Sequence, residues 1–237
     1  MRIAVLGGGV MGEALIAGMM RNLQPAPVMV LAEKRAERAN DLRDRYGLVV
    51  ADDTASACLG ADAVIVVVKP QDIRPVIADI ASSVGAGTVV ISIAAGITTA
   101  SIEQVIPQAQ VVRAMPNTPA RIDSGVTGIS AGAHCPVSGV ATAQQLLGAV
   151  GAVIEIPEEL QDAITAVSGS GPAYAFYLAE AMLEGARSVG LPDDAARTAV
   201  VQTLLGAARL LASAGDDPAQ LRANVTSPGG TTAAAVA

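Results

Sequence analysis

The sequence predicts an α/β fold, with a Rossmann-type doubly wound sheet followed by an all-helical dimerisation domain. Three observations predict it. A strand-like run, Arg2–Leu6, leads through a glycine-rich turn into a helical stretch. Short apolar runs then alternate with helical stretches as far as about residue 156, which is typical of parallel strands joined by crossover helices. After Pro157 the alternation ends, and long runs rich in Ala and Leu predict helices alone.

The glycine-rich turn has the spacing G-x-G-x-x-G. Gly7 permits the tight turn, Gly9 lets a pyrophosphate approach the backbone, and Gly12 lets the helix pack on the sheet. The N–H groups at the start of the helix would then face the phosphates. We therefore predict a dinucleotide site at six consecutive positions: Gly7, Gly8, Gly9, Val10, Met11 and Gly12. The alternative is that these glycines serve the turn alone.

The elements of the first domain follow from the apolar periodicity. Strands are expected at 2–6, 27–32, 48–51, 63–68, 88–93, 110–115, 125–131 and 151–156. Helices are expected at 11–22, 34–45, 71–84, 99–106 and 141–149. The run 63–68 is apolar throughout, so we expect a central strand of a parallel sheet, covered on both faces.

The expected domains are 1–157, a dinucleotide-binding domain, and 158–237, a helical domain for substrate binding and dimerisation. Two long helical runs, 173–189 and 193–214, are separated by Gly190-Leu191-Pro192. Both runs are apolar nearly all round, so they must be buried. Because a domain of this size cannot bury all of that surface alone, we expect a homodimer through this domain. The alternative is a compact monomeric bundle.

The composition narrows the possible partners. Of 237 residues, 51% are hydrophobic, yet no apolar run approaches the ~20 residues of a membrane span. The net charge of −7 and the 2% aromatic content argue against a nucleic-acid partner. Cys58 and Cys135 have neither a metal-ligand spacing nor a paired pattern. With the first strand starting at residue 2, we expect no signal peptide, a cytoplasmic enzyme, no metal and no membrane partner.

The adenosine end of the expected site carries charges of both signs. Glu33 follows the second strand, where a carboxylate favours the free ribose hydroxyl of NAD(H). Lys34 and Arg35, followed by Arg38, favour the 2′-phosphate of NADP(H) instead. Three cations favour NADP(H) as the cofactor, with NAD(H) as the alternative. These side chains are also compatible with an ordinary solvated start of a helix.

Five further segments look too specific for plain structure. Val68-Lys69-Pro70 and Ala94-Ala95-Gly96-Ile97 follow two strands at the edge where ligands bind in open α/β sheets. Met115-Pro116-Asn117-Thr118-Pro119 follows a third strand. Ser168-Gly169-Ser170-Gly171-Pro172-Ala173-Tyr174 is expected to open a helix with Pro172 in its first turn. The polar loop Asn224–Thr232 could form a concavity for a carboxylate.

Taken together, these motifs resemble the pyrroline-5-carboxylate reductase family, in its order and spacing and over essentially the whole chain. The glycine turn is shared with many dehydrogenases, whereas Ser168–Tyr174 and Thr226–Thr232 are specific to the family. The resemblance implies reduction of 1-pyrroline-5-carboxylate to L-proline by NAD(P)H. It also implies a dimer of interlocked helical domains, often assembled further into a decamer.

The resemblance also implies roles for residues of the carboxyl-terminal loop. Ser227, Gly230 and Thr231 would hold the substrate carboxylate. Thr232 would hydrogen-bond the ring nitrogen and donate or relay a proton; the alternative is that Thr232 merely caps a helix. Asn224 is expected beside the nicotinamide or the substrate.

Further site residues are expected in the first domain and at the domain boundary. Val68 and Pro70 would line the cofactor through backbone atoms, and we favour a positioning role for Lys69 over a role as catalytic acid. Small side chains at Ala95 and Gly96 would let a flat ring lie against the backbone. Two more residues complete the expected set, Thr54 for the cofactor and Glu158 for the substrate.

The expected chemistry needs few catalytic groups. A protonated imine accepts hydride readily, and positioning alone can lower the barrier by ~7–11 kcal/mol. His134 is the only histidine and is expected on the surface, and Lys34 and Lys69 are the only lysines. The sequence therefore offers no catalytic His-Asp pair.

Two alternative functions agree with part of the sequence. The β-hydroxyacid dehydrogenases share the glycine turn and a helical second domain, and Pro136-Val137-Ser138-Gly139 is similar to part of their substrate signature, but they use a lysine from the helical domain. A non-enzymatic NADP(H)-sensing protein would have no use for a carboxylate-binding loop.

The chain departs from the reductase family at Glu33-Lys34, and the family usually continues some way beyond the last loop. Preference between NADPH and NADH, assembly beyond the dimer and regulation by proline stay open.

Overall fold

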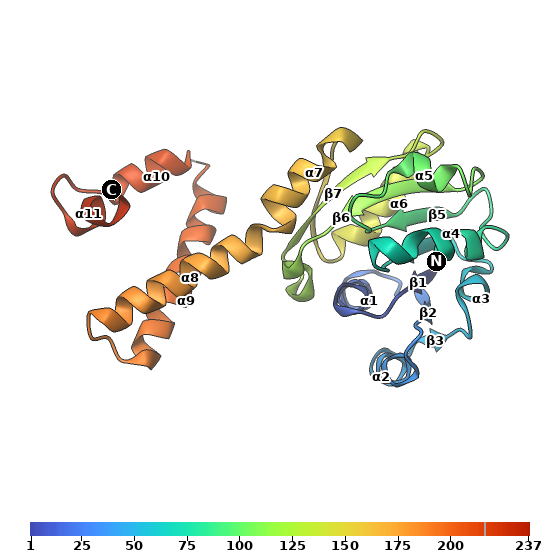
Figure 1. Cartoon of the computed structure of the whole chain (residues 1–237), viewed down its shortest axis with the longest axis horizontal. Coiled ribbons are helices and arrows are strands. Elements are labelled where there is room, and N and C mark those ends of the chain that lie inside the picture. The colour runs from blue at the N-terminus through green and yellow to red at the C-terminus, as the bar shows by residue number, and fades with distance from the viewer. Residues whose placement is uncertain (216) are drawn as a thin grey trace. The chain divides into compact units, whose positions relative to one another are not determined.

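The computed structural model describes residues 1–215 and 217–237 (Figure 1). The chain divides into two compact units, Met1–Pro172 and Ala173–Ala237, and each unit is described by itself. The division lies within one long helix rather than at Pro157. The predicted boundary at 157/158 stays a prediction.

The first unit contains one eight-stranded sheet with the order β3-β2-β1-β4-β5-β6-β7-β8. The strands are β1 (Arg2–Leu6), β2 (Val28–Ala32), β3 (Val49–Val50), β4 (Ala63–Val66), β5 (Val89–Ser92), β6 (Gln110–Met115), β7 (Gly125–Ala131) and β8 (Gly151–Glu155). Each strand lies within a range predicted from the sequence. The order turns back on itself between β1 and β4, as in a doubly wound fold, so the predicted fold class is confirmed.

The expectation of an all-parallel sheet is wrong at one place. β7 runs antiparallel to β6, with Arg113 opposite Ser130, whereas β8 returns parallel to β7. Only the short segment 116–124 joins β6 to β7, and it holds a 3₁₀ helix, Thr118–Ile122. A parallel crossover needs a dozen or more residues, so a link of this length can only turn the chain back.

Helices cover both faces of the sheet (Figure 1). On one face α1 (Val10–Asn22), α2 (Ala36–Tyr46) and α6 (Val137–Gly148) share an apolar cluster with alternate strand residues. On the other face α3 (Thr54–Cys58), α4 (Ile73–Ile80) and α5 (Thr99–Glu103) cover the intervening strand residues. Both faces of β4 are therefore buried, as its uninterrupted apolar sequence predicts.

Helical segments begin directly after Pro157. Short 3₁₀ and α segments, Glu158–Leu160 and α7 (Gln161–Ile164), lead into a π-helical stretch, Thr165–Gly169, before α8 (Gly171–Ser188). The Ser170 N–H donates to the Thr165 carbonyl at 2.9 Å, the five-residue spacing of a π-helix. Because α8 begins at Gly171, the segment Ser168–Tyr174 opens that helix as predicted, with Pro172 in its first turn, and the first two residues of the segment end the π-helical stretch.

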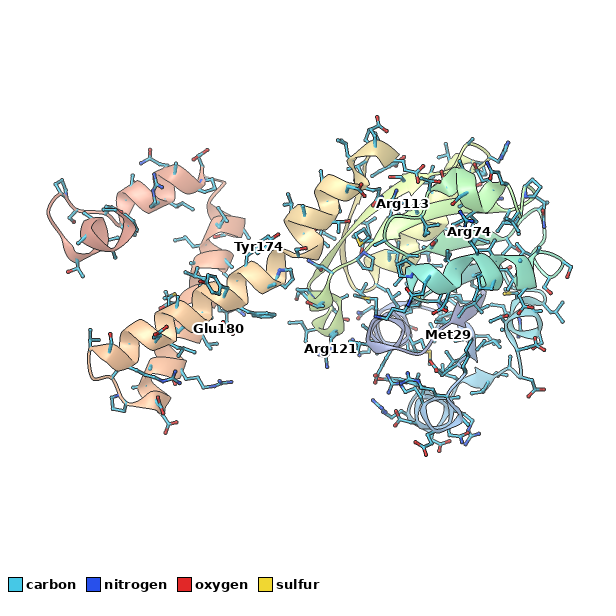
Figure 2. All side chains as sticks on the ribbon, viewed as in Figure 1. Met29, Arg74, Arg113, Arg121, Tyr174 and Glu180 are labelled. Atoms are coloured by element: carbon cyan, nitrogen blue, oxygen red, sulfur yellow. The ribbon has the colours of Figure 1, made fainter. Side chains whose placement is uncertain are left out.

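The second unit is helical. It contains α8 from Ala173 onward, then α9 (Asp193–Ala214) and the short helices α10 (Pro218–Asn224) and α11 (Thr231–Val236). Large apolar side chains stay exposed on α8 and α9, namely Phe176, Tyr177, Leu178, Val201, Leu205 and Leu210. Figure 2 labels Tyr174 and Glu180 on α8. Across residues 1–215 and 217–237, no helix is both long and apolar enough to cross a membrane.

Candidate active site

A pocket of about 580 Å³ opens at the carboxyl ends of β1, β2 and β4, where the strand order reverses. This is the place where open α/β sheets bind nucleotides. Its wall includes both sequence-predicted and unpredicted residues: Leu6, Gly7, Gly9, Ala32, Glu33, Lys34, Arg35, Ala51, Asp52, Asp53, Thr54, Val67, Val68, Lys69, Asp72, Val76 and Asp79.

The glycine turn has the shape that a pyrophosphate requires. Gly7 has a φ of 110°, a conformation that favours glycine. A Cβ at Gly9 would meet no atom within 4 Å, so the backbone there is open to the pocket. Gly9 is also the N-cap of α1, and as a glycine it has no side chain that could cap this helix end. The residues present therefore fit a bound dinucleotide, while the individual roles of Gly7 to Gly12 stay predictions.

Two charged side chains hold the peptide groups of Gly8. The Gly8 N–H donates to Glu33 Oε2 at 2.8 Å, and Arg38 Nε donates to the Gly8 carbonyl at 2.8 Å. A Cβ at Gly8 would come closer than 3.0 Å to the side chain of Leu42 on α2. Residues that follow β2 or lie on α2 therefore hold the glycine turn in place, and the motif alone does not predict these contacts.

The cations predicted to favour NADP(H) are not equivalent. Lys34 and Arg35 line the pocket. Arg38, in contrast, is engaged by Gly8, Glu13 and Asp41, so its guanidinium is already paired. Arg38 thus interacts with residues of α1 and α2, whereas Lys34 and Arg35 lie on the pocket wall.

The Glu33 carboxylate also has hydrogen-bond partners within the protein. Its Oε1 accepts from the Arg35 N–H at 3.0 Å and from Arg35 Nε at 3.1 Å. Burial raises the pKa of the Glu33 carboxyl, but hydrogen bonds from Arg35 and Gly8 outweigh burial and hold that pKa below its usual value. Glu33 therefore stays ionised at neutral pH.

Four acidic residues of the pocket wall were not anticipated: Asp52, Asp53, Asp72 and Asp79. Asp53 caps α3 by accepting from the Ser56 N–H at 2.7 Å, and the hydroxyl of predicted Thr54 bonds to Asp79. The spacing Asp53-x-x-Ser56 before a small apolar run was an available signal for this missed helix. In the part of the chain that the structure describes, no three His, Cys, Asp or Glu side chains are placed to hold a metal ion.

The other residues predicted at the sheet edge lie at two different cavities. Val68 and Lys69 line the pocket, and Pro70 begins a 3₁₀ helix, Pro70–Asp72, directly after them. Ala95 and Gly96 follow β5 and are exposed, and Gly96 lines a separate cavity of about 240 Å³ between α4 and α5. The structure thus brings Val68 and Lys69 to the glycine turn and leaves Gly96 on a different cavity.

Glu158 has protein partners on both carboxylate oxygens. Oε1 accepts from the Thr99 N–H at 2.8 Å and lies 3.5 Å from Arg113 Nη1, and Oε2 accepts from the Thr99 hydroxyl at 2.7 Å. Arg113 projects from β6 (Figure 2), with its side chain 5% exposed and Asp162 3.4 Å from its Nη2. The predicted contact of Glu158 with substrate stays a prediction beside these structural contacts.

Asn117 joins two of the predicted motifs within the first unit. Its Nδ2 donates to the Ser168 carbonyl at 3.1 Å, and its Oδ1 accepts from the Val126 N–H at 3.0 Å. The side chain is buried. The asparagine between two prolines therefore fastens the π-helical stretch to β7.

His134 is exposed, as predicted. The backbone N–H of His134 donates to Glu103 Oε1 at 3.0 Å, and the ring Nδ1 lies 3.6 Å from the same oxygen. These contacts lie outside the pocket wall.

The carboxyl-terminal loop belongs to the second unit. Gly229 has a φ of 71°, and the Gly230 N–H donates to the Ser227 carbonyl at 3.0 Å, which closes a tight turn. Gly230 is the N-cap of α11, so Thr231 and Thr232 are its first two residues. The alternative interpretation of Thr232 as the helix cap is therefore wrong. Asn224 ends α10 and accepts from Gln220 Nε2 at 2.8 Å.

Comparison with known proteins identifies the family. Residues 158–237 match the family model described as pyrroline-5-carboxylate reductase dimerisation, and residues 2–96 match the one described as NADP oxidoreductase coenzyme F420-dependent. The chain is 40% identical to the pyrroline-5-carboxylate reductase of Corynebacterium melassecola, over 99% of this chain and 88% of that protein. The chain belongs to the pyrroline-5-carboxylate reductase family.

Solved structures agree with this membership. The pyrroline-5-carboxylate reductase of Coxiella burnetii has a TM-score of 0.90 and 35% identity, covering 99% of this reductase and 88% of that chain. The fold is also shared with the pyrroline carboxylate reductase of Plasmodium falciparum, solved with NADP bound, at a TM-score of 0.86 and 23% identity, covering 99% and 87%.

The matches confirm the predicted family, the assignment as an oxidoreductase and the use of NADP(H). They set aside both alternatives, a β-hydroxyacid dehydrogenase and a non-enzymatic NADP(H) sensor. For this reductase the predicted helical dimerisation region also coincides with a family model of that description.

Proposed function

We propose that this reductase reduces 1-pyrroline-5-carboxylate to L-proline with NADPH or NADH, the last step of proline biosynthesis, in the cytoplasm. The observation that carries the proposal is the full-length 40% identity to an enzyme of that name, combined with a glycine turn open to a pocket at the strand switch point.

The reaction needs a bound dinucleotide and a held substrate. The nicotinamide, when bound, supplies the hydride that the protonated C=N carbon accepts. Gly7, Gly9 and Gly12 shape the turn for the pyrophosphate, and Lys34 and Arg35 lie on the pocket wall beside the adenosine end. Val68 and Lys69 continue that wall beyond β4.

The carboxyl-terminal loop is proposed to bind the substrate. Ser227, Gly230 and Thr231 would hold the carboxylate through hydroxyl and backbone N–H groups. Thr232 would hydrogen-bond the ring nitrogen and donate or relay its proton. The tight turn at Gly229 and the half-buried Thr232 support this assignment, because both restrict the directions in which the loop presents its polar groups.

Homodimerisation through the helical domain, with further assembly into a decamer, is part of the proposal. The exposed apolar side chains of α8 and α9 support an interface, because an uncovered apolar face of this kind marks a protein contact. Light scattering on the purified chain should give at least the mass of a dimer, and a monomer at micromolar concentration would contradict the proposal.

The activity is tested on the full chain with 1-pyrroline-5-carboxylate and each reduced cofactor. We expect substrate-dependent loss of nicotinamide absorbance and stoichiometric formation of L-proline, measured by mass spectrometry. A 2-keto acid of similar size serves as the control acceptor. Cofactor oxidation with the keto acid but not with the imine would overturn the proposal.

A further inference from the structure

Glu33 occupies the position from which a carboxylate binds ribose in NAD-dependent enzymes, yet its oxygens are already engaged. Oε2 accepts from Gly8, and Oε1 accepts twice from Arg35. The side chain is 9% exposed. Since a carboxylate has about four acceptor positions, three of them are taken by the protein itself.

The pocket wall has more negative than positive side chains, which does not favour strong binding of a 2′-phosphate. Five carboxylates line the pocket, those of Glu33, Asp52, Asp53, Asp72 and Asp79. Three cations accompany them, Lys34, Arg35 and Lys69. A phosphate entering beside Lys34 and Arg35 therefore also approaches the ionised Glu33, which lines the same pocket.

The Arg35–Glu33 contact is exposed at the arginine end only. The Arg35 side chain is 68% exposed and the Glu33 side chain is 9% exposed, so water screens the guanidinium while the carboxylate stays fixed beside the pocket. The main effect of the Glu33 charge on a nearby phosphate is thus repulsion rather than organisation of its ligands.

We propose that Glu33 is a specificity-determining residue whose carboxylate opposes the 2′-phosphate without binding the ribose, so that the pocket binds NADP and NAD with similar affinity. Lys34 and Arg35 favour the phosphate, and Glu33 offsets much of that preference. The proposal rests on dinucleotide binding in this pocket, which is part of the proposed function, but not on the identity of the imine substrate.

The test measures binding of NADP⁺ and NAD⁺ to the wild-type chain and to Glu33→Gln by isothermal calorimetry. The amide keeps an acceptor for the Gly8 N–H and removes the charge. We expect NADP⁺ affinity to rise roughly five- to tenfold while NAD⁺ affinity changes less than about twofold. Glu37→Gln removes the same charge at an exposed position of α2 outside the pocket wall and should leave both affinities unchanged.

Other results would overturn the proposal. A selective loss of NAD⁺ affinity would make Glu33 a ribose ligand, and an equal loss for both nucleotides would make it a support of the glycine turn. Unchanged affinities would remove Glu33 from cofactor choice altogether.

A second measurement uses the wild-type chain alone and does not depend on the folding of a variant. Adenosine 2′,5′-bisphosphate and adenosine 5′-monophosphate are titrated separately. The proposal expects their dissociation constants to differ by less than about tenfold, or ~1.4 kcal/mol. A larger preference for the bisphosphate would overturn it. Both measurements read binding, so absence of imine reduction would contradict the proposed function and leave this inference to be judged separately.

Discussion

Gly12 packs directly on Gly7: a Cβ at Gly12 would come closer than 3.0 Å to the Gly7 carbonyl oxygen. The obstacle is backbone, which cannot move aside as a flexible side chain could. Gly9, between them, has open space where its Cβ would lie. Two glycines of one motif are therefore required for different reasons, close packing at Gly12 and ligand access at Gly9.

The first prediction separates these two reasons. Gly12→Ala should lower the free energy of unfolding by about 1–3 kcal/mol, because the methyl group forces the turn and α1 apart. Gly9→Ala should leave that free energy within about 1 kcal/mol of wild type, since φ at Gly9 is −66° and suits alanine. Its NADP⁺ affinity should nevertheless fall at least about tenfold. Urea denaturation and calorimetry measure the two effects, and wild-type binding by Gly9→Ala would contradict the role in ligand access.

The strands of the fold could be predicted because apolar runs such as 63–68 are local patterns. The direction of β7 was not predicted, because it is set by the link that precedes the strand and not by the strand's own residues. The length of the segment 116–124 was the available signal, since it is too short for a crossover. The helix at Thr54–Cys58 was missed because it is too short to show helical periodicity.

In the site, the glycine turn could be predicted because its motif is contiguous. The pairing of Arg38 with Gly8 and Glu13 could not, since it depends on how α2 packs beside α1. A count of charges along the sequence does not show that Arg38 is paired within the protein. The acidic residues of the pocket wall come from segments far apart in the sequence, including Asp79 on α4, and meet only in the folded chain.

The second prediction concerns the buried Arg113. Among the residues that the structure describes, Arg113 has two carboxylate partners, and Glu158→Gln removes one of them and leaves Asp162, at 3.4 Å. Because the guanidinium is buried, we expect the free energy of unfolding to fall by about 2–3 kcal/mol, below the cost of breaking a fully buried pair. Asp162→Asn is the matched control; its carboxylate is 91% exposed, and the change should cost less than about 1 kcal/mol. Unchanged stability with a raised KM for the imine would instead support the predicted substrate contact of Glu158.

The third prediction is a dependence of stability on pH through Glu13. Burial raises the pKa of the Glu13 carboxyl, but hydrogen bonds from Arg38 and Tyr46 and the charges of Arg38 and Arg45 lower it below its usual value overall. The ionised form is therefore favoured in the folded chain. Its contribution to stability is complete above the usual pKa of about 4.5 and is lost as the pH falls through the lowered pKa.

Glu13→Gln should accordingly be about 1–2 kcal/mol less stable than wild type at neutral pH, and the difference should shrink toward zero in strong acid. Urea denaturation at a series of pH values measures this difference. Glu37→Gln, at an exposed position of α2, supplies the control. A difference between Glu13→Gln and wild type that stays constant with pH would show that the ion pairs are not its source.

The fourth prediction concerns Lys34 on the pocket wall. Lys34→Ala should raise the KM for NADPH by roughly five- to tenfold and the KM for NADH by less than about twofold, because only NADPH presents a 2′-phosphate. Arg43→Ala removes a cation from the exposed face of α2, where Arg43 pairs with Asp44, and should alter neither constant. An equal effect of Lys34→Ala on both cofactors would remove Lys34 from recognition of the phosphate.

The fifth prediction is that the Thr232 hydroxyl serves catalysis and not the start of α11. Gly230 is the N-cap of that helix, so losing the hydroxyl at its second residue should change the melting temperature little. Turnover should fall roughly 10²–10³-fold in Thr232→Ala, the range typical of a lost proton-transfer partner. Thr232→Val keeps the shape and should be equally impaired, whereas Thr232→Ser keeps the hydroxyl and should retain most activity. If Thr232→Val turns over like wild type, the ring nitrogen must take its proton from another group, and the role assigned to the loop would be reduced to holding the carboxylate.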